Sequence, residues 1–306
     1  MEIKRVGIVG MGLMGVGIAR HLASLGINTT ILKWTKGPYA EARNTFLNVL
    51  HKEVARDKLT ETDVVNICSH LIWTDKPENL GECDLVIESI AEGKRVKRDC
   101  LRKLDSFIRK DAIVATNTST LKIGVLAQAL SNPSRFIGLH FFNPAHKMTL
   151  VEVVVTSKTQ SRLRDDAMEF VRRIGKEPVL VHSSPGFIVN RLLVAQMLEA
   201  VKLVFGEQLV AEDVVVVDRA MKGINHPMGP FELMDLIGID VVHAMASNLY
   251  AGLKQKHFEA PLLLEHMVEH GYLGRKSGIG FYDYRSDAKN PKPNTVVREL
   301  MDEPSE

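Results

Sequence analysis

The sequence contains few cysteines, and their spacing matches no motif. Cys68, Cys83 and Cys100 are odd in number, widely separated and without a CxxC pair. This pattern favours reduced thiols over a disulfide framework or a cysteine-based zinc site. We expect each cysteine to fill apolar space in a core, and we predict no metal site.

The sequence also lacks long apolar runs and an excess of one charge. No stretch approaches the roughly 18 consecutive apolar residues of a membrane helix. Because a strand pattern begins almost at the first residue, we expect no cleavable leader. Basic and acidic residues number 39 and 37, so no overall field draws the protein onto nucleic acid or an anionic membrane. We expect a cytoplasmic protein with neither partner.

Short apolar runs alternate with helical patterns through the first 184 of the 306 residues. Two helical patterns, over residues 39–54 and 63–68, form an insertion in this alternation. Strands that alternate with helices specify a largely parallel sheet covered on both faces, so we predict an α/β, doubly wound domain of Rossmann type. The strands are expected near residues 6–9, 29–32, 71–74, 84–89, 112–117, 135–142, 149–156 and 177–182.

Strand patterns disappear after residue 184. Residues 186–204, 211–223, 229–253 and 261–270 all read as helices. We therefore predict a dinucleotide-binding domain over 1–184 and an all-α domain over 185–285. The apolar helices of the second domain predict a substrate and dimer domain. Residues 286–306, of mixed charge and with several prolines, are expected to form a loose tail.

A glycine-rich turn follows the first expected strand. In the GxGxxG pattern Gly10 allows a tight turn, Gly12 lets the backbone approach a pyrophosphate, and Gly15 lets helix and strand pack closely. Three glycines alone also fit an ordinary strand-to-helix turn, but their place at the first turn of an alternating fold favours a dinucleotide. The residues predicted to line the cofactor here are Gly10, Met11, Gly12, Leu13, Met14 and Gly15.

The residue that should hold the adenosine ribose is a lysine. A carboxylate is expected about 20 positions after the glycines, and Lys33 lies 23 positions after Gly10. A lysine would attract the 2′-phosphate of NADP, with Lys36 as a second cation and Trp34 against the adenine. Alternatively Lys33 is a solvated lysine and the cofactor is NAD. The sequence leaves NAD and NADP open.

The run HFFNPAHKMTLVEVV combines a histidine and a carboxylate on neighbouring expected strands. His140 ends one strand, and Glu152 lies 12 positions later in the next, far enough for the second strand to return beside the first. An imidazole that acts as general base needs a partner that fixes its tautomer and stabilises its charged form. A carboxylate meets both requirements.

Eight motifs lie in order along nearly the whole chain: VGIVGMGLMGVGIA, DLVIESIAEGKRVK, ATNTSTL, HFFNP, LVEVV, SPGFIVNRLL, HPMGPFELMDLIG and GYLGRKSGIGFYDY. With these motifs the chain resembles the short-chain 3-hydroxyacyl-CoA dehydrogenases, including the 3-hydroxybutyryl-CoA type. The resemblance implies that His140 is the general base and Glu152 its orienting partner. It implies that Ser119 and Asn190 contact the 3-oxygen and thioester region of the substrate.

The same resemblance places three further residues at the nicotinamide half of the cofactor: Glu92, Lys97 and Lys276. It implies an oxidoreductase that interconverts (S)-3-hydroxyacyl-CoA and 3-oxoacyl-CoA with NAD or NADP, and a homodimer formed through the C-terminal domain. Two departures stand out. Lys33 replaces the family's aspartate, and the family's serine and lysine contacts to CoA have no clear counterparts around residues 46–53.

Other interpretations fit fewer features. A nucleotide-binding scaffold or sensor without turnover has no need to keep the histidine, glutamate, serine and asparagine together, and a related sugar-acid dehydrogenase matches HFFNP less well. His266 and His270 fit an HxxEH zinc pattern, but this short pattern arises by chance and ends beside Gly271. The basic run KRVKRDCLRK contains no aromatic residue and is typical of a solvated helix face.

Overall fold

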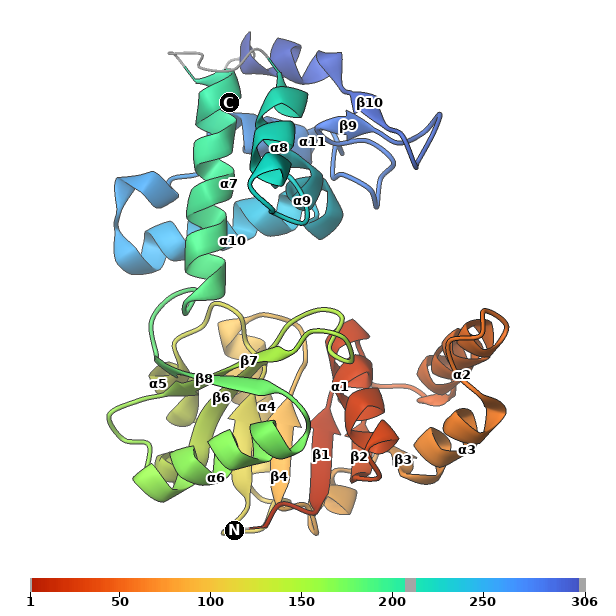
Figure 1. Ribbon diagram of the computed structural model, residues 1–306. Coiled ribbons are helices and arrows are strands. Elements are labelled where there is room, and N and C mark those ends of the chain that lie inside the picture. Colours follow the sequence, from red (N-terminus) through yellow and green to blue (C-terminus); the bar gives the residue numbers. More distant parts are fainter. Residues whose placement is uncertain (1, 207–212, 303–306) are drawn as a thin grey trace. The chain divides into compact units, whose positions relative to one another are not determined.

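Figure 1 shows the computed structural model, which describes residues 2–206 and 213–302. The chain divides into two compact units, Met1–Phe187 and Ile188–Glu306. Each unit has its own hydrophobic core.

The first unit is built on one sheet of eight strands in the order β3-β2-β1-β4-β5-β6-β7-β8. Neighbouring strands are parallel except β6 and β7, which are antiparallel. The predicted largely parallel, doubly wound sheet is confirmed, and its first six strands follow the dinucleotide-binding order. The strands are β1 (Arg5–Val9), β2 (Asn28–Leu32), β3 (Leu71–Thr74), β4 (Leu85–Glu88), β5 (Ile113–Thr116), β6 (Phe136–Phe141), β7 (Leu150–Val155) and β8 (Glu177–His182).

Helices cover both faces of this sheet, and the predicted helical insertion is present. Figure 1 shows the insertion, α2 and α3, beside the β3 edge of the sheet. Thr60 and Asp63 form a capping box that begins α3. The helices are α1 (Leu13–Ser24), α2 (Ala40–Val54), α3 (Glu61–Ser69), α4 (Lys94–Leu104), α5 (Ile123–Ala127) and α6 (Ser161–Arg173), with short 3₁₀ turns η1 (Pro77–Leu80) and η2 (Pro133–Arg135).

The central strands are apolar on both faces because helices lie over each side. Ile8 and Ile87 belong to one core cluster, together with apolar residues of α1 and α6. Val9 and Val86, one position away, belong to the opposite cluster, together with residues of α4 and α5. Successive side chains of a strand point to opposite faces, so a continuous apolar run in the sequence is what a doubly covered sheet requires.

The cysteines are free thiols within this unit. Cys83 and Cys100 are buried in the core, as predicted, and Cys68 is half-buried against it. Burial raises the pKa of Cys83 to about 11. At neutral pH this thiol therefore behaves as a small apolar group.

The second unit is helical, with α7 (Val189–Phe205), α8 (Val214–Gly223), α9 (Pro230–Ile237), α10 (Ile239–Leu253) and α11 (Leu262–Glu269). Two residues of the helix predicted over 211–223 lie outside the described ranges. The run 229–253 is two helices, because Gly238 adopts a φ of 107°, and α9 and α10 meet there at a bend of 99°. Among the described residues no single helix is long and apolar enough to cross a membrane; only this bent pair passes on length and composition.

The expectation of a loose tail is wrong for residues 292–302. β9 (Tyr282–Asp283) and β10 (Lys292–Pro293) form an antiparallel pair, and η4 (Thr295–Asp302) follows. Val297 and Leu300 are buried in the core of the second unit. The prolines and mixed charge of this segment indicated a loose tail, but these two buried apolar side chains are enough to anchor a short turn. Residues 303–306 lie outside the described ranges.

Candidate active site

The glycine-rich turn has the conformation that a dinucleotide requires. Gly10 has a φ of 116°, and a Cβ there would meet the Ser89 carbonyl at 2.4 Å. A Cβ on Gly15 would meet the Gly10 carbonyl at 2.1 Å, so the helix packs directly on the turn. A Cβ on Gly12 would meet no atom within 4 Å. Open space at Gly12, before the N-terminus of a 12-residue helix, fits a pyrophosphate.

The three residues between these glycines differ in their surroundings. Met11 and Met14 are half-buried and pack against the core, whereas the Leu13 side chain is 75% exposed. The backbone of this turn, rather than its side chains, is therefore the surface that suits a phosphate.

Lys33 lies at the same edge of the sheet as the glycine turn. Val9 pairs with Leu32 in the parallel β1–β2 ladder, so Gly10 and Lys33 follow neighbouring strand ends. The Lys33 ammonium donates a hydrogen bond of 2.8 Å to the Pro38 carbonyl. This partner is a neutral carbonyl, so the contact does not neutralise the positive charge of the ammonium.

The next residue, Trp34, is half-buried against the core. The Lys103 ammonium lies 5.9 Å from the centre of its ring. The indole is thus fixed at the strand end, beside the edge where the adenine was expected.

His140, Glu152 and Ser119 meet at the end of β6. His140 and Glu152 are directly opposed in the antiparallel β6–β7 ladder. Nδ1 of His140 lies 2.6 Å from a Glu152 oxygen, and Nε2 lies 3.1 Å from the Ser119 hydroxyl. Because an ionised carboxylate only accepts hydrogen bonds, Nδ1 carries the hydrogen and the lone pair is left on Nε2. The imidazole can then take a proton from an alcohol and return it.

The imidazole is enclosed by apolar rings and fixed backbone. His140 is 4% exposed and Glu152 is fully buried, and the rings of Phe142 and Phe187 lie 4.5 and 5.6 Å from the imidazole, centre to centre. The Asn117 side chain accepts a hydrogen bond of 2.8 Å from the backbone N–H of the residue after His140. This enclosure limits rotation of the ring and keeps water from the pair.

Glu92 holds the loop that carries Ser119. One oxygen of its carboxylate accepts hydrogen bonds from the backbone N–H groups of Ser119 (3.0 Å) and Thr120 (3.1 Å) and from the hydroxyls of Thr118 (2.5 Å) and Thr120 (3.1 Å). Burial alone raises the pKa of Glu92, but Lys97 and these hydrogen bonds outweigh it and hold the pKa below its usual value. The carboxylate is therefore charged at neutral pH.

Lys97 lies behind Glu92 and is 1% exposed. Its ammonium donates to a carboxylate oxygen of Glu88 at 2.7 Å and to the Ile90 carbonyl at 3.2 Å, and it lies 3.4 Å from the second oxygen of Glu92. Glu88, fully buried, also accepts from the Thr116 hydroxyl at 2.6 Å. Lys97, predicted to lie at the cofactor, thus faces the protein interior.

Asn190 and Lys276 belong to the second unit. Asn190 lies in the first turn of α7. Lys276 forms an ion pair with Asp240, at the start of α10. Within that unit Lys276 is also close to the bend at Gly238, where a Cβ would meet its ammonium at 2.8 Å.

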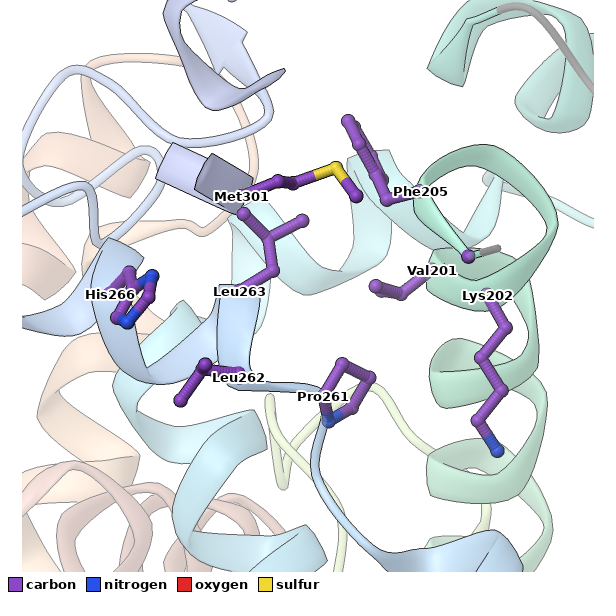
Figure 2. A pocket seen from close by; sticks show the side chains of 9 residues that line it. Val201, Lys202, Phe205, Pro261, Leu262, Leu263, His266 and Met301 are labelled. Carbon is purple, nitrogen blue, oxygen red and sulfur yellow. The ribbon is translucent and has the colours of Figure 1, made fainter. Parts of the chain in front are cut away.

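A separate hollow of about 170 Å³ lies in the second unit, between the end of α7, the start of α11 and η4. Figure 2 shows its mainly apolar lining, which includes Leu262, Leu263 and Met301, with Lys202 at the margin. His266 also lines it, but Nδ1 of this residue lies 2.7 Å from the Leu300 carbonyl. Over residues 2–206 and 213–302, no three His, Cys, Asp or Glu side chains gather as a metal site would require.

Sequence reasoning missed Glu88 and the threonines around Ser119. A signal existed for Glu88, since it is an acidic residue in the apolar strand run DLVIES. A carboxylate in a strand buried on both faces needs a cationic partner, and Lys97 follows nine residues later. The link from Glu92 to the 118–120 loop spans 26 to 28 positions, and no pattern in the sequence marks it.

Comparison with known proteins agrees with this geometry. The family model described as the NAD binding domain of 3-hydroxyacyl-CoA dehydrogenase matches residues 5–184, and that of its C-terminal domain matches residues 186–284. The 3-hydroxybutyryl-CoA dehydrogenase of Clostridioides difficile is 39% identical, with 92% of this chain and 99% of that protein covered.

Two further relatives extend the comparison. The mitochondrial hydroxyacyl-coenzyme A dehydrogenase of Sus scrofa is 37% identical over 92% of each chain. The crystal structure of (S)-3-hydroxybutyryl-CoA dehydrogenase from Ralstonia eutropha is 35% identical, covers 91% of this chain and 98% of its own, and has a TM-score of 0.85. By its two matched domains and its relatives, the chain belongs to the 3-hydroxyacyl-CoA dehydrogenase family.

Proposed function

We propose that the protein interconverts short-chain (S)-3-hydroxyacyl-CoA and 3-oxoacyl-CoA thioesters, with 3-hydroxybutyryl-CoA and acetoacetyl-CoA as its substrates. The observation that carries the proposal is the buried His140–Glu152 pair with the Ser119 hydroxyl at 3.1 Å from the free imidazole nitrogen. The relatives from C. difficile and R. eutropha are named for 3-hydroxybutyryl-CoA, which supports the short acyl chain.

His140 handles the proton of the substrate's 3-oxygen. In the oxidising direction Nε2 accepts the hydroxyl proton, and in the reducing direction it returns a proton to the same oxygen. Glu152 keeps the lone pair on Nε2 and stabilises the imidazolium that forms. The hydride chemistry at carbon 3 belongs to the nicotinamide of the bound cofactor.

Five further residues are assigned by resemblance. In the proposal Ser119 donates a hydrogen bond to the 3-oxygen, and Asn190 contacts the thioester region. The resemblance implies that Glu92, Lys97 and Lys276 lie at the nicotinamide half of the cofactor. The contacts of Ser119 and Glu92 in the first unit support their part of this assignment.

For the cofactor, we propose that the protein accepts NADP(H). Membership of the family implies a nicotinamide dinucleotide as the cofactor. The backbone of the turn over residues 10–15 suits its pyrophosphate. Lys33 lies where a carboxylate would select NAD, and its ammonium supports binding of a 2′-phosphate instead. Lys36, three positions on, adds a second positive charge.

The deciding experiment is the initial rate of acetoacetyl-CoA reduction by the purified protein, with NADPH and NADH compared over a range of concentrations. Turnover with a lower KM for NADPH supports both proposals. Turnover with NADH alone rejects the role of Lys33 but keeps the reaction. No turnover with either cofactor rejects the substrate and favours a longer acyl chain, a sugar acid or a scaffold without turnover.

We also propose domains over residues 1–184 and 185–285 and a homodimer formed through the second. The family matches over 5–184 and 186–284 support the boundary. Several large apolar side chains of the second unit are at least half exposed, including Leu192, Ile224 and Leu236, which supports an interface there. Sedimentation equilibrium tests the dimer. A cytoplasmic location remains a prediction, which cell fractionation tests.

A further inference from the structure

A charged network lies beneath the candidate active site. Glu88 and Lys97 are 0% and 1% exposed, although burying a charge is costly unless it is paired and hydrogen-bonded. Both are fully engaged: Lys97 has Glu88, Glu92 and the Ile90 carbonyl around its ammonium. An arrangement as costly as this needs a purpose beyond filling the core.

The network ends on the residue that touches His140. Glu92 accepts the Ser119 backbone N–H at 3.0 Å, while the hydroxyl of the same Ser119 lies 3.1 Å from Nε2 of His140. The other donors to Glu92 belong to Thr118 and Thr120, on either side. The position of the Ser119 hydroxyl therefore depends on where the Glu92 carboxylate is held.

Lys97 contacts the same carboxylate from its other side. It approaches one Glu92 oxygen at 3.4 Å, while the other oxygen takes the four loop donors. Glu88 fixes Lys97 in turn, and Glu88 is itself fixed by the Thr116 hydroxyl and the Ile90 N–H. The chain of contacts runs from strand β4 through helix α4 to the loop after β5.

We propose that Glu92 is a positioning residue which, held by the buried Glu88–Lys97 pair, sets the Ser119 hydroxyl against His140. Glu92 acts on the reaction through Ser119, and Lys97 acts through Glu92. This inference rests on the proposed function, in which Ser119 binds the reacting oxygen. It assigns a purpose to Glu88, and it gives Lys97 a role inside the protein rather than at the cofactor.

A double-mutant cycle on kcat separates positioning from a direct cofactor contact. Glu92→Gln and Ser119→Ala should each lower kcat by about 10-fold, and the double variant should fall no more than about threefold below the slower single variant, because the two residues act as one unit. The KM for the cofactor should change little, whereas the direct cofactor contact that the resemblance implies for Glu92 would raise it. If the two effects multiply to about 100-fold, Glu92 acts independently of Ser119 and the inference is wrong.

Asp105→Asn is the matched control. Asp105 is a carboxylate of the same unit that is paired with Arg135 and accepts from the Ser131 N–H at 3.0 Å. Its two partners, Ser131 and Arg135, lie outside the 118–120 loop. Its loss should lower the melting temperature but leave kcat, and the effect of Ser119→Ala, unchanged.

The pH profile gives a readout that a purely structural role would not move. Glu92 faces the ammonium of Lys97 and the hydroxyls of Thr118 and Thr120, and the same ammonium faces the buried carboxylate of Glu88. Lys97→Met removes the ammonium that lowers the pKa of Glu92, so the pKa rises and kcat relative to the unmodified protein should be lower at about pH 6 than at about pH 9. A relative kcat that does not change with pH contradicts the role of Lys97.

Hydrogen exchange tests the anchor without any turnover. The amides of residues 119 and 120 should exchange about 10-fold faster in Glu92→Gln and no faster in Asp105→Asn. Unchanged exchange in Glu92→Gln overturns the inference even if acetoacetyl-CoA is the wrong substrate. If Lys97→Met fails to fold, the Glu92→Gln variant still decides. If the unmodified protein shows no turnover, the proposed function is wrong. The hydrogen-exchange result still tests the positioning role of Glu92, because it does not depend on turnover.

Discussion

At the scale of single residues, the candidate active site follows from strand register. His140 and Glu152 are directly opposed across the antiparallel β6–β7 ladder, and opposed side chains in such a pair lie on the same face, about 5 Å apart. The pairing of imidazole and carboxylate therefore needs no special loop. It needs only that the chain return from β6 to β7 in this register.

His140→Gln removes the proton carrier and keeps the size of the side chain. We expect kcat for acetoacetyl-CoA reduction to fall by about 100-fold or more, because general acid–base catalysis contributes about 10² to 10⁴. The melting temperature should change little, since a glutamine amide can still donate to Glu152. Near-normal turnover would remove His140 from the mechanism.

Lys33→Asp tests the cofactor at one position. The carboxylate would repel the 2′-phosphate of NADPH and accept hydrogen bonds from the ribose of NADH. We expect the KM for NADPH to rise by about 10-fold or more and the KM for NADH to fall. Lys110→Asp, an exposed lysine before β5, is the control for the change in net charge. Equal changes in both variants would show that Lys33 is a bystander.

The sequence predicted some of these residues and not others. His140 and Glu152 were recognisable because they lie 12 positions apart on two strand patterns. The buried ion pairs of Lys97 were not recognisable, because a lysine in a run of basic residues is typical of a solvated helix face. Its burial depends on Glu88 and Glu92, which reach it only after β4 and α4 pack together.

At the scale of elements, the turn between β1 and α1 contains one glycine that the fold requires and another that cofactor binding is predicted to require. Gly10→Ala places a Cβ 2.4 Å from the Ser89 carbonyl at a φ of 116°, so we expect destabilisation of roughly 1 to 3 kcal/mol. Gly12→Ala meets no protein atom within 4 Å, so the melting temperature should stay unchanged. Cofactor affinity should nevertheless fall, because the added methyl group occupies the space predicted for the pyrophosphate.

Thermal unfolding and cofactor titration of the two variants check this prediction together. Gly10→Ala should lower the melting temperature, whereas Gly12→Ala should lower only the affinity for the cofactor. Normal cofactor affinity in a stable Gly12→Ala protein would mean that the pyrophosphate does not approach this turn.

The elements themselves were largely predictable where they carry a strong local pattern. The eight strands of the sheet lie close to their expected positions because each is an apolar run between turn signals. The break between α9 and α10 was missed, since the apolar pattern continues through Gly238. The turn η4 was missed because its order comes from contacts with α11, distant in the sequence, such as that of Leu300 with His266.

At the scale of the whole molecule, the C-terminal segment is fixed to the second unit by two buried carboxylates. Asp218 accepts from the backbone N–H groups of Phe231 and Glu232 and from the Tyr282 hydroxyl. Asp235 accepts from two further backbone N–H groups, at residues 281 and 282, and from a second tyrosine hydroxyl. These contacts join α8 and α9 to the strand β9.

This arrangement predicts how stability changes with pH. Burial raises the pKa of Asp235 to about 6, above the value of roughly 3.9 in an unfolded chain. Between these values the folded state binds a proton that the unfolded state does not, so the contribution of Asp235 to stability is present at low pH and is lost as pH rises through 6. From about pH 7.5 to pH 5 the gain should be on the order of 1 kcal/mol.

Urea unfolding of the unmodified protein and Asp235→Asn at both pH values isolates this contribution. Other groups oppose it: burial lowers the pKa of His21 and His146, which destabilises the fold as pH falls, but they act equally in both proteins. Asp235→Asn should be less stable at each pH, because an amide nitrogen replaces one acceptor that faces backbone N–H groups. The unmodified protein should gain stability relative to the variant as pH falls. A constant difference would mean that Asp235 is ionised throughout and that its hydrogen bonds outweigh its burial.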